Sequence, residues 1–434
     1  MNPLSHRPFS VAGPSNGYVW YVVWLLFAVN MLNYVDRMIL AVLIEDIRRD
    51  IPMTDTQIGI VTGLAFAAFY AAAGIFLGRL ADLYSRRMLM GVAITGWSIA
   101  TAACGMAASF WHLLVARLFV GFGEASSMPA SQSLIADYCG IERRAAAYAI
   151  LAAGGSVGLT VGLAGGGWLA GQVGWRTAFV VAGALGLPFA LLLWWTLKDP
   201  VRGAQDRGAA TREGLPFSDV LAALIRNRTF LYIVLSSTCT GFVLYGVAQW
   251  MPAYLIRRFG LSTAEVGLYF GLAMGVGAAV GAIVGGFLTN RLVARGVHWL
   301  LTLPLLVNLL IVPAYWGLLS SPSLSFTIAG LFLINIVGAL GFGSAIAGLH
   351  SVVPAGMRAS ASAVYGLFTS LLGVGLAPFL IGVLSDHFHA AAGPGEALRL
   401  ALMIATTVGW GTPFFLWLAR RNFNEALVHS ESNE

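Results

Sequence analysis

Long apolar segments follow one another along almost the whole chain, separated by short polar turns that carry Arg, Asp, Pro or Gly. A helix that crosses a bilayer needs about 20 mostly apolar residues. Twelve segments approach this length, at residues 20–45, 56–80, 87–107, 110–137, 145–172, 175–197, 229–256, 263–290, 297–318, 324–350, 359–385 and 396–419. The pattern therefore predicts an all-α membrane protein with twelve transmembrane helices.

Composition and charge placement support a membrane location. Of the 434 residues, 58% are hydrophobic and only 10% are charged, which leaves too little polar surface to cover a soluble protein of this size. If the N-terminus lies inside, most Lys and Arg residues fall on the cytoplasmic side, as the positive-inside rule requires. We therefore expect a multi-pass protein of a bacterial-type inner membrane, with both termini cytoplasmic. No basic stripe with interleaved aromatic residues indicates a nucleic-acid partner.

One long polar interruption divides the chain into two parts. The predicted organisation is a cytoplasmic tail, a six-helix bundle, a cytoplasmic linker, a second six-helix bundle and a cytoplasmic tail, at residues 1–19, 20–197, 198–228, 229–420 and 421–434. The first tail has neither an apolar core nor a small-residue cleavage site, so we expect no signal peptide.

The two parts repeat short motifs in matching places. Gly78-Arg-Leu-Ala-Asp82 follows the second segment, and Gly286-Phe-Leu-Thr-Asn290 follows the eighth. Basic residues also precede the fifth and the eleventh segments. Two motifs repeated in equivalent positions indicate a duplicated architecture of two pseudo-symmetric bundles.

This architecture resembles the major facilitator superfamily over nearly the full chain. The stretch from Gly78 to Arg87 is similar to the superfamily motif that holds one conformational state of the alternating-access cycle. The resemblance implies a conformational latch made of Gly78, Asp82, Arg86, Arg87, Arg143, Asn290 and Arg291. Ser85 replaces the usual glycine and Asn290 replaces the acid, so the latch of the second half should be weaker. The alternative is a solvated basic turn that matters only for topology.

Four charged residues interrupt the apolar segments of the first half: Asp36, Arg37, Arg117 and Glu124. Each would cost several kcal/mol against lipid, so we expect all four to face the protein interior. A rise of 1.5 Å per residue places Asp36 and Arg117 at similar depths, and Arg117 and Glu124 lie two turns apart on one helix face. These residues can therefore form a pair or a cluster, either for coupling and substrate binding or as a static ion-pair network.

The motifs around these charges resemble those of the Spinster-like group of lysolipid and sphingoid-phosphate transporters. They are Asn33-Tyr34-x-Asp36-Arg37 and Arg117-x-x-x-Gly-x-Gly-Glu124-Ala. The resemblance implies proton coupling through Asp36 and Glu124, and substrate binding through Arg37, Arg117, Asn33 and Tyr34. The anion:cation symporter group shares much of the same pattern and remains the alternative.

The second half carries no charge at comparable depth. Its polar and aromatic side chains could form the opposite wall of a substrate site, and the candidates are Tyr245, Gln249 and Tyr365, with Asn308 and Asn335 beside them. The alternative for each is a satisfied packing residue. His350 and Asp386 lie near segment ends, where an interfacial location is the default, and we assign them no role.

The predicted function is secondary transport by alternating access, driven by a proton gradient. Arginine's planar fork suits a carboxylate or a phosphate, so the expected partner is an anionic or amphiphilic, lipid-like solute. A small organic anion/proton symporter is the alternative, and a transporter-like membrane receptor is a candidate from a different class. An enzyme is disfavoured, because no nucleophile with an adjacent base is found.

No cofactor or metal is expected. The chain has no Walker-type phosphate loop, and Cys104, Cys139 and Cys239 lack the spacing of metal ligands. By analogy with the superfamily, the protein should be a monomer.

Overall fold

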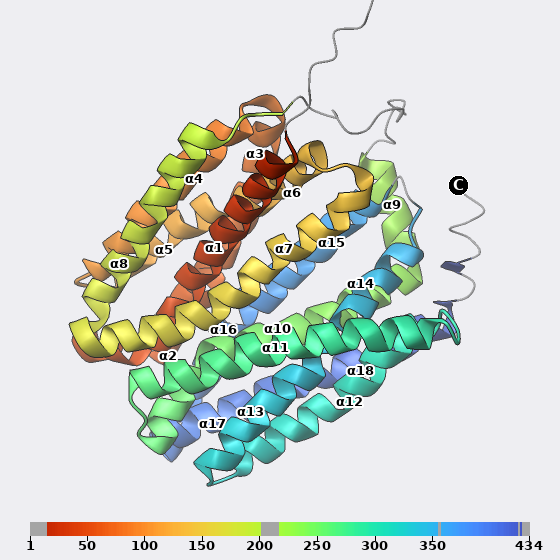
Figure 1. Cartoon of the computed structure of the whole chain (residues 1–434). Helices are drawn as coiled ribbons and strands as arrows, with labels where there is room; N and C mark the ends of the chain where they lie inside the picture. Colours follow the sequence, from red (N-terminus) through yellow and green to blue (C-terminus); the bar gives the residue numbers. More distant parts are fainter. Residues whose placement is uncertain (1–14, 201–216, 355–356, 424–425, 428–434) are drawn as a thin grey trace, which may run out of the picture.

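The computed structural model describes residues 15–200, 217–354, 357–423 and 426–427; at positions 75, 78, 79, 81–83, 141, 217, 218 and 359 it describes the backbone only. In the described part of the chain every regular element is a helix, and the helices form two bundles (Figure 1). The first bundle contains α1 (Asn16–Asp50), α2 (Asp55–Gly59), α3 (Ala65–Leu83), α4 (Arg86–Gly105), α5 (Phe110–Glu124), α6 (Ser127–Tyr138), α7 (Ile141–Thr160) and α8 (Gly166–Thr196).

The second bundle begins after the linker. It contains α9 (Phe217–Arg226), α10 (Arg228–Phe259), α11 (Thr263–Val293), α12 (Trp299–Ser320), α13 (Leu324–Ala339), α14 (Phe342–Ser351), α15 (Arg358–Phe368), α16 (Ala377–Ala392), α17 (Pro394–Thr407) and α18 (Gly411–Arg421). The short helix α9 occupies part of the predicted linker and packs through Val220 and Leu224 on the core around Phe230. Residues 201–216 of the linker lie outside the described residues.

Twelve membrane crossings account for this helix order. Ten helical stretches in the described residues are long and apolar enough to span a membrane. One of them, Glu142–Thr196, contains two crossings, because Gly174 has a φ of 80° and the chain reverses there (Figure 1). The pair α5 and α6, interrupted at Ala125, supplies a further crossing along the predicted segment 110–137. The predicted fold class is confirmed.

The first helix starts earlier than the apolar pattern suggested. Helix α1 begins at Asn16, because the Ser15 hydroxyl caps it by accepting a hydrogen bond from the Tyr18 N–H at 3.4 Å. Such a cap satisfies an amide that the first turn would otherwise leave without a partner. Four residues of the predicted N-terminal tail therefore belong to the first helix.

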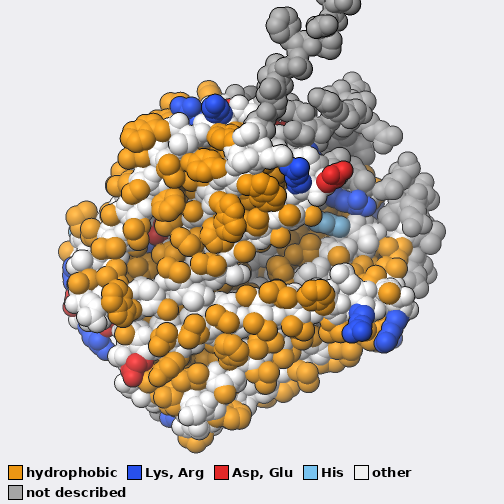
Figure 2. All heavy atoms as spheres, viewed as in Figure 1, with side chains coloured by type: hydrophobic (Ala, Val, Ile, Leu, Met, Phe, Trp, Pro, Cys, Tyr) orange, Lys and Arg blue, Asp and Glu red, His pale blue; other side chains and the backbone are white. Residues whose placement is uncertain are grey.

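The two bundles meet at one end and diverge at the other. Helices α7 and α11 lie together near the end that holds Asp50, Asp55 and Phe259, which we call the closed end, and separate toward the end that holds Asn16 and Arg421, which we call the termini end (Figure 1). Between the bundles the surface is hollowed (Figure 2).

Glycines allow the backbones to touch along two seams at the closed end. A Cβ atom added at Gly63 would lie 2.7 Å from the carbonyl oxygen of Gly375, and one added at Gly167 would lie 2.6 Å from that of Thr263. Small residues let helices approach without side-chain interference. Three π-helical segments line these seams, Ile60–Leu64 before α3, Val161–Gly165 before α8 and Thr369–Leu376 before α16. Such wide turns often mark functional positions in helices.

We expect Gly63→Ala to open the seam. The new methyl group would press on the Gly375 backbone, and overpacking of this kind costs about 1–3 kcal/mol. With the native cysteines replaced by alanine, a cysteine at Ala67, buried beside Gly375, should react faster with a polar maleimide. Gly74→Ala is the control, because nothing lies within 4 Å of its Cβ position. Equal rates of maleimide labelling in Gly63→Ala and Gly74→Ala would show that Gly63 is not needed for close packing at the seam. As a further control, a cysteine at buried Ala147 should stay protected in both variants.

Candidate functional site

The four buried charges of the first bundle come together between α1 and α5. The Nε atom of Arg37 lies 2.7 Å from Oε2 of Glu124, whose side chain is 0% exposed. Arg117 donates from Nη1 to the backbone carbonyl oxygen of Asp36 at 3.3 Å. The predicted cluster, including the matching depth of Asp36 and Arg117, is confirmed.

This cluster has unused hydrogen-bonding capacity. Among the described residues, the second carboxylate oxygen of Glu124 and Nε of Arg117 are buried without a hydrogen-bond partner. The Asp36 carboxyl group interacts electrostatically with Glu124 and Arg117. Buried polar groups without partners are costly and rare, so an ion-pair network built only for stability would be expected to satisfy them. The arrangement favours a site that exchanges partners over a static network.

Aromatic rings surround the Arg37 guanidinium. Its Cζ atom lies 4.9 Å from the ring centroids of both Phe66 and Tyr70, and 5.4 Å from that of Tyr34. Arg117 also lies over the Phe66 ring, at 5.1 Å. Cation–π contacts of this kind hold a guanidinium without neutralising it. Arg37 therefore stays charged although aromatic rings surround it.

The second bundle contributes Tyr245 to this cluster. Tyr245 of α10 interacts with Tyr34, Arg37 and Tyr70 across the interface between the bundles. Gln249, one turn further along α10, is buried, and its side-chain oxygen has no hydrogen-bond partner among the described residues. Tyr245 therefore lies across from the charged cluster, and the role of Tyr245 and Gln249 in substrate binding stays a prediction.

Other predicted wall residues lie elsewhere. Tyr365 of α15 interacts with Ser237, which precedes Tyr245 by eight residues, about 12 Å along α10. Asn308 and Asn335 donate to the carbonyl oxygens of Pro304 and Leu331 in their own helices, both at 2.8 Å. In this conformation the structure does not bring Tyr365 to the charged cluster, and the two asparagines correspond to the packing alternative. Asn33 is buried on α1, one turn before Arg37.

The predicted latch residues bond within the first bundle. Arg86 pairs with Asp137 and donates from Nη1 to the Ser133 hydroxyl at 2.7 Å. The backbone N–H of Arg87 donates to Oδ1 of Asp199 at 3.1 Å, which ties α4 to the start of the linker. Asp137 and Asp199 are the partners that the sequence had not assigned.

The remaining latch residues are at the surface or lie outside the described side chains. Arg143 donates to the side-chain oxygen of Asn16 at 2.6 Å, and Asn290 and Arg291 are exposed on α11. Gly78 and Asp82 lie on α3, where only their backbone belongs to the described part of the chain. The role of the latch in the transport cycle stays a prediction.

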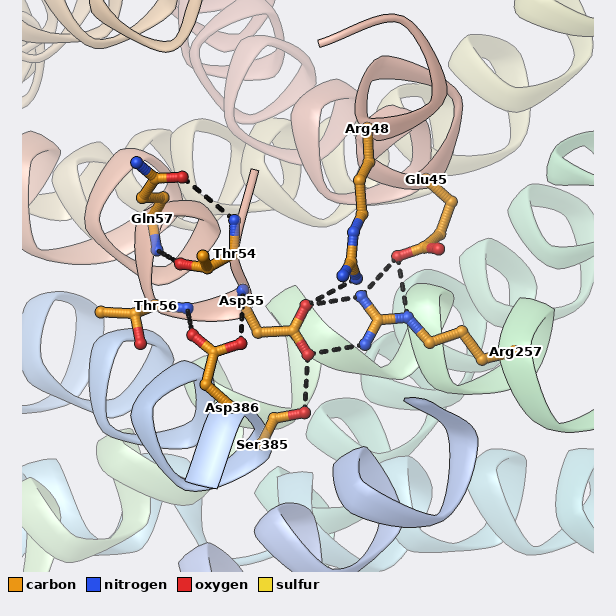
Figure 3. A network of polar contacts seen from close by, with 9 residues as sticks. All are labelled: Glu45, Arg48, Thr54, Asp55, Thr56, Gln57, Arg257, Ser385 and Asp386. Carbon is orange, nitrogen blue, oxygen red and sulfur yellow. Dashed lines mark hydrogen bonds and ion pairs between the residues drawn. The ribbon is translucent and has the colours of Figure 1, made fainter. Parts of the chain in front are cut away.

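A second charged network joins the two bundles at the closed end (Figure 3). It consists of Glu45, Arg48, Asp55, Arg257, Ser385 and Asp386, and we call it the clasp. Arg257 of α10, 5% exposed, reaches across the interface to Glu45 on α1 at 2.7 Å and to both oxygens of Asp55 on α2, at 2.7 and 2.8 Å.

The clasp is fully bonded around Asp55, whose side chain is 0% exposed. Besides Arg257, this carboxylate accepts from Arg48 at 2.8 Å and from the Ser385 hydroxyl at 2.6 Å. A bidentate arginine–carboxylate pair with every remaining oxygen satisfied is the geometry in which a buried ion pair is most stable.

Asp386 completes the clasp by capping a helix of the other bundle. Its two carboxylate oxygens accept the backbone N–H groups of Asp55 at 2.9 Å and of Thr56 at 2.7 Å (Figure 3). These amides open α2, so a negative charge is favourable there. The sequence assigned Asp386 no role, and the local signal near its partners was the capping box that Thr54 and Gln57 form at the start of α2. Among the described residues, no group of His, Cys, Asp and Glu is arranged to hold a metal ion.

Comparison with known proteins adds to this geometry. The model of the Major Facilitator Superfamily matches residues 26–378. The chain is 30% identical over 417 residues to an MFS-type efflux pump of Mycolicibacterium smegmatis, a match that covers 94% of each protein. It is 29% identical over 429 residues to protein spinster homolog 1 of Xenopus tropicalis, covering 91% of this chain and 79% of that protein.

A solved structure is similar over almost the entire length. It is the crystal structure of a bacterial homolog to the human lysosomal transporter Spinster, in an inward-facing and unoccupied conformation. The TM-score is 0.86 at 28% sequence identity, and the match covers 95% of this chain and 99% of that chain. Both the helix order and the relative placement of the bundles are therefore shared.

We expect Arg257→Gln to weaken the closed end. Asp55 would keep Arg48 and Ser385 but lose its bidentate partner, a loss of about 1–3 kcal/mol that shifts a two-state population roughly 5- to 140-fold. Distances between nitroxide labels at Arg49 and Ala390, both exposed, should report more molecules separated at this end. Arg258→Gln is the matched control, since Arg258 is the exposed neighbour on α10. The same distance distribution in both variants would show that the clasp does not hold the bundles together.

Proposed function

Because this chain belongs to the Major Facilitator Superfamily and is one of its Spinster-like transporters, we propose that it couples proton movement to the transport of an amphiphilic or anionic organic solute. The chain is thus a multi-pass membrane transporter and not an enzyme. The observation that carries the coupling is the buried Arg37–Glu124 pair, in which one Glu124 oxygen is bonded and the other has no hydrogen-bond partner among the described residues.

The proposed exchange follows from the charges. With Glu124 ionised, its carboxylate occupies Arg37 at 2.7 Å, and a second anion must compete with it for the guanidinium. A proton on Glu124 removes this competitor, so Arg37 and Arg117 together present two positive charges to an incoming carboxylate or phosphate. Asp36, which interacts with both Glu124 and Arg117, is the second proton carrier. Proton and solute binding are linked because the Glu124 carboxylate and the solute compete for the same arginine, so that protonation of Glu124 favours binding of the solute.

The surroundings of the two arginines support an amphiphilic solute. Tyr34, Phe66 and Tyr70 line one side, and Tyr245 faces them from the second bundle. Such a wall offers apolar area together with phenolic hydroxyl groups, which suits an acyl or sphingoid chain next to an anionic headgroup. A lysolipid-like or sphingoid-phosphate-like solute therefore fits better than a small, fully polar anion.

The orientation in the membrane is part of the proposal. With both termini cytoplasmic, the clasp lies on the outer side and the hollow between the bundles opens inward, in a bacterial-type inner membrane. This is the state named for the Spinster-homolog crystal structure. We propose a monomer, because the site is built entirely within one chain.

We expect Glu124→Gln and Asp36→Asn to abolish solute-dependent proton flux. Both substitutions keep the side chain's size but remove the group that takes up the proton. The measurement is the internal pH of proteoliposomes challenged with a lysophospholipid, a sphingoid phosphate or a small organic acid. Glu142→Gln, an exposed carboxylate on α7, is the matched control.

The solute that evokes flux separates the substrate classes. Flux with the small acid alone would replace the amphiphile by an anion:cation symporter type of substrate. Wild-type flux that persists in both variants would refute coupling through these carboxylates.

The proposed topology has its own test. A cysteine placed in either terminal tail of a chain without native cysteines should be labelled by an impermeant maleimide only in inverted membrane vesicles. A cysteine at exposed Arg49, at the closed end, should be labelled only in right-side-out vesicles. The reverse pattern would invert the orientation, and with it the side from which the site is open.

A further inference from the structure

Phe66 occupies a position that connects the seam between the bundles with the charged cluster. Its side chain is 2% exposed, and its ring lies 4.9 Å from Cζ of Arg37 and 5.1 Å from Cζ of Arg117. Two arginines from different helices therefore share one phenylalanine ring. Because the ring face attracts both cations, the ring helps fix their positions relative to each other.

The backbone at Phe66 is held from the other side by α5. A Cβ atom added at Gly121 would lie 3.0 Å from the carbonyl oxygen of Phe66 and 3.2 Å from its ring. Glycine at position 121 thus makes room for the ring between α1 and α5. Phe66 has little freedom to rotate unless its own helix moves.

The helix that carries Phe66 also forms the seam. Gly63, one turn earlier, belongs to the π-helical segment Ile60–Leu64 and touches Gly375 and Pro378 of the second bundle. Separation of the bundles at the closed end would break this contact. A change in the π-helical turn would then move the following turn of the helix, which carries Phe66. Packed elements of this kind respond in discrete steps.

We infer that Phe66 is a positioning residue that links the state of the seam to the Arg37–Glu124 pair. The inference rests on the proton coupling proposed above and adds the element that carries it between sites. With the seam closed, the Phe66 ring holds Arg37 against Glu124. Opening the seam withdraws the ring and loosens the pair. By reciprocity, protonating Glu124 biases the seam toward opening.

Several charged or titratable groups surround the Arg37–Glu124 pair. Arg37 and Asp36 of α1 and Arg117 of α5 interact with Glu124 directly. Around them, Tyr34 of α1, Tyr70 of α3 and Tyr245 of α10 interact with Arg37, and Cys104 of α4 interacts with Asp36 and Arg117. Phe66 itself does not titrate. A variant at Phe66 therefore changes the link to the seam without adding or removing a proton site.

The test is the pH dependence of opening, which needs no solute. Nitroxide labels at Arg49 and Ala390 report the closed end by their distance distribution at pH 5 and pH 8. In the otherwise wild-type chain without native cysteines, the fraction of molecules separated at the closed end should be larger at pH 5 than at pH 8. In Phe66→Leu the change should shrink by about threefold to tenfold, the scale of a lost cation–π contact.

Control variants separate positioning from packing. Phe66→Tyr keeps the ring and should retain the pH response, whereas Phe66→Met, which fills similar volume without a ring, should behave as Phe66→Leu. Phe69→Leu changes the same kind of side chain on the same helix where it is 46% exposed, and should leave the response intact. Combined with Glu124→Gln, which removes the titrating group, Phe66→Leu should have no further effect on the pH response.

Each other outcome overturns the inference in a recognisable way. A full pH response in Phe66→Leu and Phe66→Met would show that the ring does not carry the coupling. A loss in Phe66→Leu that adds to that of Glu124→Gln would show a general packing effect. If the wild-type chain itself shows no pH response, the proposed proton coupling fails, and the role of Phe66 fails with it.

Discussion

A charged side chain cannot face lipid, and this constraint organises the interior of the protein. Placing an ionised group in the membrane costs several kcal/mol unless another group of the protein compensates it. Arg37 and Glu124 meet this requirement by pairing at 2.7 Å, and Arg117 meets it through the Asp36 carbonyl and the Phe66 ring. The helices α1, α3 and α5 are consequently held in one arrangement around these charges.

The two charged networks solve the same problem differently. At the closed end, Asp55 accepts hydrogen bonds from Arg48, Arg257 and Ser385, and Asp386 caps the amides that open α2. In the central cluster, oxygen and nitrogen atoms of buried charges remain without partners among the described residues. A network that must hold a conformation benefits from complete bonding, whereas one that must exchange a proton or a solute needs a free acceptor. This contrast distinguishes a structural clasp from the proposed transport site.

The seams must hold the bundles together in one state and release them in another. Glycine backbones touch at Gly63 and Gly167, so the contact depends on close packing over short stretches and not on long interlocking side chains. π-helical turns lie beside these contacts on both sides of the interface. The clasp adds directional charge pairs to the non-directional packing, and together they define the closed end of the observed conformation.

The sequence by itself determined the class of the protein, the crossings and the charged cluster of the first bundle. Hydropathy is a local property, and position along two predicted helices was enough to place Asp36 and Arg117 at similar depths and Arg117 and Glu124 on one helix face. The clasp was beyond sequence reasoning: Arg257 lies 202 residues from Asp55, and both are near helix ends, where a solvated charge is unremarkable. The position of Tyr365 and the sharing of Phe66 by two arginines were also decided only by the tertiary structure. A helix's sequence fixes which residues share its face and depth, but the partner of that face depends on how the bundles pack together.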